Sequence, residues 1–167
     1  RSDHGDGAGD HALLGKGHIP DGNPNAFGLR VLDDGNSLRG GMQSFPGGFQ
    51  STFDSRGSQN LEDGTWHPIA MVVDRVAGTQ TIYLDGNSLG ALSIAGFTGS
   101  MGSADPLTIG QLLGGSFANG MIDDVAFWNR ALTRDEIAFL ANQPLTNFIP
   151  EPSSLVLLAI GLLGMGL

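Results

Sequence analysis

Short apolar runs separated by turn residues dominate this chain from Ala12 to about Asn142. Each run has the length of a β-strand, and Gly, Asn and Asp recur between the runs. Glycine supplies 27 of the 167 residues, about twice its ordinary share, without a collagen-like period. The pattern therefore predicts an all-β domain of short strands and tight turns.

The first half of this region contains three candidate strands, which are Ala12–Lys16, Phe27–Leu32 and Leu38–Met42. Residues 33–36 read Asp-Asp-Gly-Asn and predict a hairpin between the last two strands. Phe45, Phe49 and Phe53 follow at four-residue spacing. The Pro-Gly-Gly sequence at 46–48 argues against a helix there, so we expect the three phenylalanines to anchor the core.

The clearest strand signal is Trp66–Asp74, which is apolar on both alternating faces, as in a strand buried on both sides. Pro68 cannot donate to a ladder and should lie near the start of that strand. Residues 75–78 turn the chain from that strand into Thr79–Leu84, which alternates and ends at the Asp-Gly-Asn turn of residues 85–87. This pattern predicts a hairpin with its register largely fixed. Further strands are expected at Leu92–Phe97, Leu107–Ile109 and Met121–Trp128.

One helix is predicted after these strands. Thr133 stands as its N-cap, Glu136 as the acid of a capping box, and Leu132 with Ile137 as a hydrophobic staple. The helix should run for about two turns to Asn142 and form a lid over one end of the sheets.

Composition excludes several function classes. The formal charge is −9, and Lys16 and seven scattered arginines are the only basic residues besides histidine, which disfavours nucleic-acid binding. Without cysteine there is no disulfide, thiolate zinc site or cysteine nucleophile.

Residues 1–11 form a polar, glycine-rich segment before the domain, and we expect it to be flexible. Its Asp and His residues are also candidate metal ligands: Asp3, His4, Asp6, Asp10 and His11.

The C-terminal part divides into a linker, residues 144–154, and an apolar segment, Leu155–Leu167, without a charged residue. Thirteen helical residues span about 20 Å, less than the roughly 30 Å of a bilayer core, so we expect a truncated membrane-anchor helix. Pro150, Glu151 and Pro152 before this segment resemble the PEP-CTERM sorting signal of Gram-negative bacteria. That resemblance implies export, processing by an exosortase-type enzyme and a place at the cell surface or in the biofilm matrix. The family's final basic cluster is missing, which implies truncation at this end.

Three segments together resemble the LamG-like jelly-roll domain of the concanavalin A-like lectin/glucanase superfamily: Gly64–His67 with its strand, Ile82–Gly86 and Gly120–Leu132. The resemblance covers residues 12–143 and implies an antiparallel two-sheet sandwich whose concave face binds glycans in many relatives. The strands that normally precede Lys16-Gly17 are missing, which implies truncation at the N-terminus as well. The resemblance also implies a structural calcium ion near Asp123. Alternatively, Asp123 accepts hydrogen bonds from loop amides, and Asp124 pairs with Arg130.

The sequence favours binding over catalysis. The glutamates Glu62, Glu136 and Glu151 do not form the Glu-x-Asp-x-Glu motif of the superfamily's glucanases, and no Gly-x-Ser-x-Gly elbow is present. His67 is interpreted as a structural residue at a strand end. We therefore predict a non-catalytic, secreted carbohydrate-binding or adhesion module that interacts with polysaccharides or glycoprotein glycans.

The predicted aromatic platform for a glycan is Tyr83, which shares the polar face of its strand with Thr79 and Thr81, because Trp66 and Trp128 lie in segments expected to be buried. Gln111 and Asn119 of the 110–119 loop are further candidate ligand-binding residues. The alternative is a structural or protein-interaction sandwich without glycan affinity.

Overall fold

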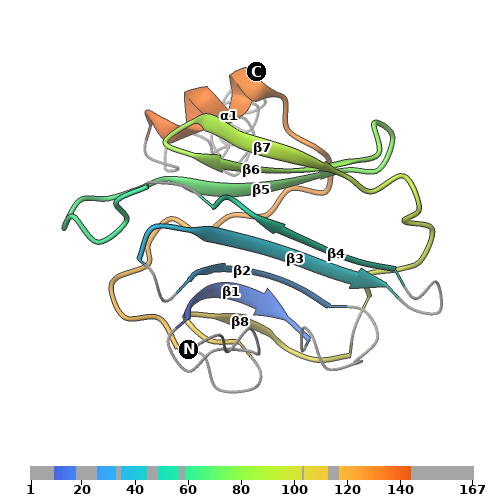
Figure 1. Cartoon of the computed structure of the whole chain (residues 1–167), viewed down its shortest axis with the longest axis horizontal. Helices are drawn as coiled ribbons and strands as arrows, with labels where there is room; N and C mark the ends of the chain where they lie inside the picture. Colours follow the sequence, from blue (N-terminus) through green and yellow to red (C-terminus); the bar gives the residue numbers. More distant parts are fainter. Residues whose placement is uncertain are drawn as a thin grey trace, which may run out of the picture.

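The computed structural model describes residues 10–17, 26–32, 35–44, 49–56, 59–102, 104–112 and 117–143. These residues form eight strands and one helix, arranged as two layers with the helix on the outside (Figure 1). The elements are β1 (His11–Lys16), β2 (Ala26–Val31), β3 (Leu38–Ser44), β4 (Phe49–Asp54), β5 (Ile69–Asp74), β6 (Thr79–Leu84), β7 (Asn87–Ser93), β8 (Leu107–Ile109) and α1 (Arg134–Ala141).

The strands form one sheet of order β4-β3-β2-β1-β8 and another of order β5-β6-β7. All neighbours within both sheets are antiparallel. This arrangement confirms the predicted all-β, two-sheet sandwich with one short helix. The sandwich begins slightly earlier than predicted, because β1 starts at His11 and Asp10 is already buried.

Two predicted hairpins are confirmed, and local turn geometry explains both. β2 and β3 pair with Val31 opposite Leu38, and Gly35 in the connecting turn has φ of 64°. Between β6 and β7, Asp85 and Gly86 both have positive φ, at 50° and 77°. Two consecutive positive φ angles are the signature of the type I′ turn that matches strand twist.

The strand predicted at Leu92–Phe97 is wrong. The tight turn at 85–86 lets pairing resume immediately at Asn87, so β7 occupies Asn87–Ser93 and the chain then turns at residues 95–96. Pro68 lies just outside β5, as expected, because β5 begins at Ile69.

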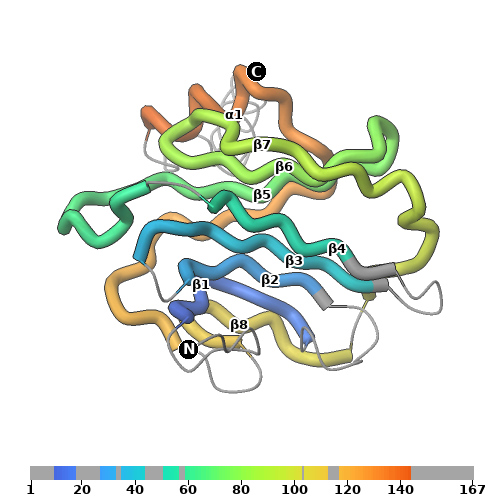
Figure 2. The backbone as a smooth tube through the Cα atoms, in the orientation of Figure 1, coloured from blue at the N-terminus to red at the C-terminus, as the bar shows by residue number. Residues whose placement is uncertain are grey.

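The strand predicted at Met121–Trp128 is also wrong. This segment joins no sheet, and large apolar side chains along it are exposed, with Met121 at 80% and Phe127 at 53%. In Figure 2 the segment rises from the β8 side to α1 and runs in the same left-to-right direction as β5. Among the described residues β5 pairs only with β6, so its other edge is unpaired. The 121–128 segment on this side is also unpaired, and Asp124 within it has a positive φ of 52°, which interrupts a regular strand.

The main core lies between the two sheets. Leu29, Val31 and Leu38 of the five-stranded sheet pack against Ile82 and Leu84 of β6. Phe53 packs against this cluster, as expected, whereas Phe45 lies outside the described residues. A second cluster of Met42, Ile94 and Phe97 extends the core toward one end.

Helix α1 covers the outer face of the three-stranded sheet rather than one end of the sandwich. Leu132 and Ile137 pack there against Tyr83. The predicted capping box is confirmed, because the Thr133 side chain accepts from the Glu136 amide and the Glu136 side chain accepts from the Thr133 amide. Within the described part of the chain, no helix is long and apolar enough to cross a membrane. Residues 144–167, including Pro150, Glu151 and Pro152, lie outside the described residues.

Candidate ligand-binding surface

The outer face of the five-stranded sheet carries two rows of side chains that the strand register sets side by side. Leu29 and Leu38 point inward, so their neighbours along β2 and β3 point outward. The first outward row runs across β4, β3 and β2 as Asp54, Arg39 and Arg30. The second row crosses all five strands as Thr52, Gly41, Gly28, Gly15 and Thr108.

A shallow, open hollow lies over these rows. Its lining residues are Gly28, Arg30, Arg39, Gly41, Thr52 and Leu112. Leu112 lies over Gly28, since a Cβ on that glycine would come within 3.1 Å of Leu112 Cδ2. Leu112 folds back over the outer face from the segment after β8, and a methyl group on Gly15 would collide with its side chain. The hollow therefore has a polar end made by the arginines and an apolar wall made by Leu112.

Ion pairs hold both arginines of the hollow in place. The guanidinium of Arg39 donates from Nε and Nη2 to the two carboxylate oxygens of Asp54, at 2.6 and 3.0 Å. Arg30 Nη1 lies 3.1 Å from Asp10 Oδ2, and both of these side chains are at most 10% exposed. Charges that are this buried must be paired, so the arginines and aspartates form a fixed, electrically balanced group.

Polar groups at the rim extend this surface. Thr52 is exposed beside Gly41. Two residues after Gly41, the Oε1 atom of Gln43 is buried and has no hydrogen-bond partner among the described residues. A saccharide hydroxyl both donates and accepts, so a surface row of guanidinium, carboxylate and hydroxyl groups offers it suitable hydrogen-bond partners.

The structure does not bring the predicted glycan residues together. Tyr83 is only 9% exposed because α1 packs on its face of the sheet, so the prediction of an exposed platform there is wrong. Gln111 follows β8 in the other sheet and pairs with Phe117 through an isolated bridge, and Asn119 is exposed beyond it. A ligand role for Gln111 and Asn119 stays a prediction.

Asp123 is exposed, and its Oδ1 accepts the amide hydrogen of Asp124 at 2.8 Å. That contact matches the alternative expected for Asp123. Arg130 pairs with Glu136 at 2.6 Å, which differs from the pairing with Asp124 that was considered. In the described ranges no three His, Asp or Glu side chains are placed to hold a metal ion. Side chains alone therefore do not build a calcium site at Asp123, and calcium there stays a prediction.

His67 forms a polar latch between two segments. Its Nδ1 lies 3.1 Å from Asp85 Oδ2 in the β6–β7 turn, and its Nε2 lies 3.2 Å from Asp63 Oδ1 in the loop before β5. Desolvation lowers the pKa of His67, but hydrogen bonds and charge from Asp85 and Asp63 outweigh it and leave the pKa raised. Hydrogen bonds from the Thr65 side chain and amide lower the pKa of Asp63. These contacts fit the structural role expected for His67.

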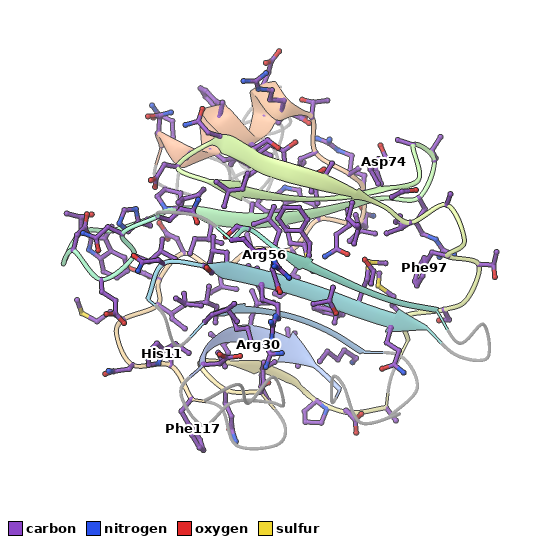
Figure 3. The ribbon with its side chains drawn as sticks, in the orientation of Figure 1. His11, Arg30, Arg56, Asp74, Phe97 and Phe117 are labelled. Atoms are coloured by element: carbon purple, nitrogen blue, oxygen red, sulfur yellow. The ribbon has the colours of Figure 1, made fainter. Side chains whose placement is uncertain are left out.

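Both tryptophans differ from expectation, because Trp66 is 61% and Trp128 is 45% exposed. Phe117 is also exposed, and Figure 3 shows it beyond β8, pointing away from the sheets. Apolar residues are thus exposed along the side of the sandwich that extends from β8 to the free edge of β5.

Sequence reasoning missed Arg30 and Arg39, although a signal was present. Side chains alternate along a strand, so each arginine points to the opposite face of the sheet from the leucine next to it. The 33–36 hairpin then places the two predicted strands in register. The hollow itself was not predictable, because it depends on Asp10 and Leu112, which come from distant parts of the chain.

Comparisons with known proteins agree with this architecture. A family model described as the concanavalin A-like lectin/glucanases superfamily (Laminin_G_3) matches residues 4–138. No curated protein matches the chain.

Solved structures with a similar fold include the CBM40 of the Ruminococcus gnavus IT-sialidase, at 19% identity and a TM-score of 0.64, covering 79% of this chain and 74% of that one. The same CBM40 bound to alpha2,3 sialyllactose matches at 17% identity and a TM-score of 0.57, with the same coverage. The receptor binding domain of botulinum neurotoxin D matches at 9% identity and a TM-score of 0.52, covering 80% of this chain and 32% of that one. The likeness to these structures concerns the fold. From the match over residues 4–138, the chain belongs to the concanavalin A-like lectin/glucanase superfamily, as a LamG-like domain.

Proposed function

We propose that this chain is a non-catalytic carbohydrate-binding module whose ligand binds in the hollow on the outer face of the five-stranded sheet. The observation that carries the proposal is the ion-paired row of Asp54, Arg39 and Arg30, which lies beside the exposed Thr52 on the same face of the sheet. The CBM40 structures named as bound to sialyllactose support it by analogy of fold.

The positions of the described glutamates support a non-catalytic role. Glu62 lies against the Gly35 turn, where a Cβ on that glycine would come within 2.7 Å of its carboxyl carbon. Glu136 is engaged in the capping box and with Arg130. Neither carboxylate lines the hollow, whereas a glycosidase needs two carboxyl groups flanking the scissile bond.

The proposal includes an incomplete domain. The free edge of β5 and the exposed Met121, Phe127 and Trp128 support a further strand on that side. Edge strands in natural sheets are normally protected by charges, proline or covering segments. β5 has Pro68 before it and Asp74 at its end, but neither a charge nor a proline lies between them. His11 Nε2 lies 3.8 Å from Glu62 Oε1, so the start of β1 is near the loop that precedes β5.

Export, sorting through Pro150-Glu151-Pro152, processing by an exosortase-type enzyme and transient membrane anchoring through the C-terminal segment complete the proposal. They rest on the resemblance of residues 150–167 to the sorting signal. Calcium at Asp123 is likewise proposed from the resemblance. Expression of the complete encoded polypeptide in a Gram-negative host, followed by fractionation and mass spectrometry of the C-terminus, tests the sorting.

Depletion from solution by a panel of polysaccharides and immobilised sialyllactose tests binding. Thr52→Tyr fills the rim of the hollow at an exposed position, whereas Thr98→Tyr makes the same change at an exposed loop residue. We expect the Thr52 variant to lose glycan retention and the Thr98 variant to keep it. A folded protein that no glycan retains would instead favour the structural or protein-interaction sandwich.

A further inference from the structure

Asn119 stands apart from the other asparagines of this chain, because it alone is followed by glycine. We infer that Asn119 is a modification site, at which the side-chain amide is lost in a spontaneous reaction with water. The product is a mixture of aspartate and isoaspartate, and either one adds a negative charge to the formal −9 of the chain. The inference does not depend on the proposed carbohydrate binding.

The reaction is intramolecular and consumes only water. The deprotonated backbone nitrogen of Gly120 attacks the side-chain carbonyl carbon of Asn119, so that an N–C bond forms, the Cγ–Nδ2 bond breaks and ammonia leaves. Water then opens the resulting cyclic succinimide at one of its two carbonyl groups, which gives either aspartate or isoaspartate. Glycine favours the first step because it has no Cβ to hinder the approach of its nitrogen.

The structure leaves both reacting groups open. Asn119 and Gly120 are exposed and lie outside every strand and helix. Among the described residues, no hydrogen bond engages the Asn119 side chain or the Gly120 amide. Gly120 has φ of 153°, and no described atom beyond its chain neighbours lies within 4 Å of the place where a Cβ would be. Phe117, two residues earlier, points away from the sheets (Figure 3).

Two comparable positions are held by the fold. Asn87 is the first residue of β7, and its Nδ2 donates to the Asp85 carbonyl at 3.1 Å. Aspartate followed by glycine undergoes the same cyclisation with loss of water, but Gly86 lies in a tight turn, where a Cβ would come within 3.1 Å of Ala138 Cα in α1. Both positions must open locally before they can react. The fold therefore favours reaction at Asn119 over these two positions.

Storage of the folded protein at mildly alkaline pH, followed by peptide mass spectrometry, tests the inference. We expect the peptide containing Asn119 to gain the mass difference between an amide and an acid at least about tenfold faster than peptides containing Asn87 or Asn129. Gly120→Ala should slow this conversion about tenfold, because a Cβ hinders the nitrogen and disfavours the positive φ. As a matched control, Ser88→Gly places the same dipeptide in β7, and Asn87 of that variant should keep its amide while the protein stays folded.

Three results would overturn the inference. The first is conversion at Asn119 that is no faster than conversion at Asn129. The second is conversion in urea-unfolded protein but not in folded protein, because the fold would then protect this segment. The third is equally fast conversion of Asn87 in folded Ser88→Gly, since the dipeptide alone would then select the site. If Gly120→Ala does not fold, the comparison of Asn119 with Asn129 in the wild-type protein decides.

Discussion

Gln80 is the most informative residue to perturb, because it joins the two sheets through the centre of the core. Its side chain is fully buried. Its Oε1 accepts from Ser51 Oγ at 2.7 Å, and its Nε2 donates to the Gly40 carbonyl at 2.8 Å. Gly40 also allows the sheets to approach closely, since a Cβ there would lie 2.8 Å from Ile82 Cδ1. The buried amide thus links β6 to β4 and β3.

Gln80→Leu keeps the volume nearly constant but leaves the Ser51 hydroxyl and the Gly40 carbonyl without this partner. A buried polar group left unsatisfied costs about 1–3 kcal/mol. The Ser51 hydroxyl is such a group, whereas Gly40 still pairs with Phe53 in the sheet, so the free energy of unfolding should fall by about 1–3 kcal/mol. At a urea m-value of about 2 kcal/mol per molar, the unfolding midpoint should fall by about 0.5–1.5 M.

A second variant separates the loss of hydrogen bonds from the loss of packing. Adding Ser51→Ala to Gln80→Leu removes the hydroxyl that has lost its hydrogen-bond partner. The free energy of unfolding of the double variant should therefore be about 1–3 kcal/mol higher than that of Gln80→Leu alone. Gln111→Leu, outside the strands, should change stability by less than about 0.5 kcal/mol. Urea unfolding followed by circular dichroism measures all four proteins. A Gln80→Leu protein as stable as the wild type would refute the reasoning that this clamp holds the sheets together.

Three further predictions concern the helix, the latch and calcium. Thr133→Ala removes the N-cap and should destabilise the domain by about 1 kcal/mol in thermal melts, whereas Thr133→Ser should be close to neutral. The raised pKa of His67 means that its contacts with Asp63 and Asp85 stabilise the fold fully below an unfolded pKa of about 6.5 and less as pH rises through the folded pKa. The melting temperature should therefore fall on that rise in the wild type but not in His67→Asn, and equal slopes would contradict the latch. Calcium at Asp123 should bind weakly, at about 0.1–1 mM, because Asp123 is the only carboxylate proposed as its ligand. A calcium-dependent rise in melting temperature that persists in Asp123→Asn would exclude this residue.

Local chemistry explains the elements that were predictable. The 85–86 turn has the Asp-Gly pair that accepts two positive φ angles, so the pairing of Leu84 with Asn87 follows from adjacent residues. Thr133 and Glu136 likewise start α1 through contacts three residues apart. In both cases the groups that interact are neighbours in the chain. The rest of the β6–β7 register is different, because an irregularity at Ile82 and Tyr83 shifts it and Gly90 there lies against Phe53 of β4.

Elements that depend on distant partners were not predictable in the same way. Met121–Trp128 has strand periodicity, but periodicity describes faces and does not supply a neighbouring strand. Tyr83 shares a strand face with Thr79 and Thr81, which indicated exposure, yet α1 docks on that face and buries the ring. Trp66 is apolar and follows a strand-like pattern, but it precedes β5 and is exposed.

The amino-acid sequence by itself determined the all-β class, the hairpins, the capped helix and the resemblance to the superfamily, because each depends on short-range spacing of residue types. Tertiary structure alone decided which faces are covered and where a hollow forms. Arg30 and Arg39 became neighbours through the β2–β3 register. Their ion pairs came from Asp10 and Asp54, and Leu112 came from beyond β8 to line the hollow beside them. A binding surface of this kind is built from contacts between segments far apart in the chain, so it exists only after the sheets have assembled.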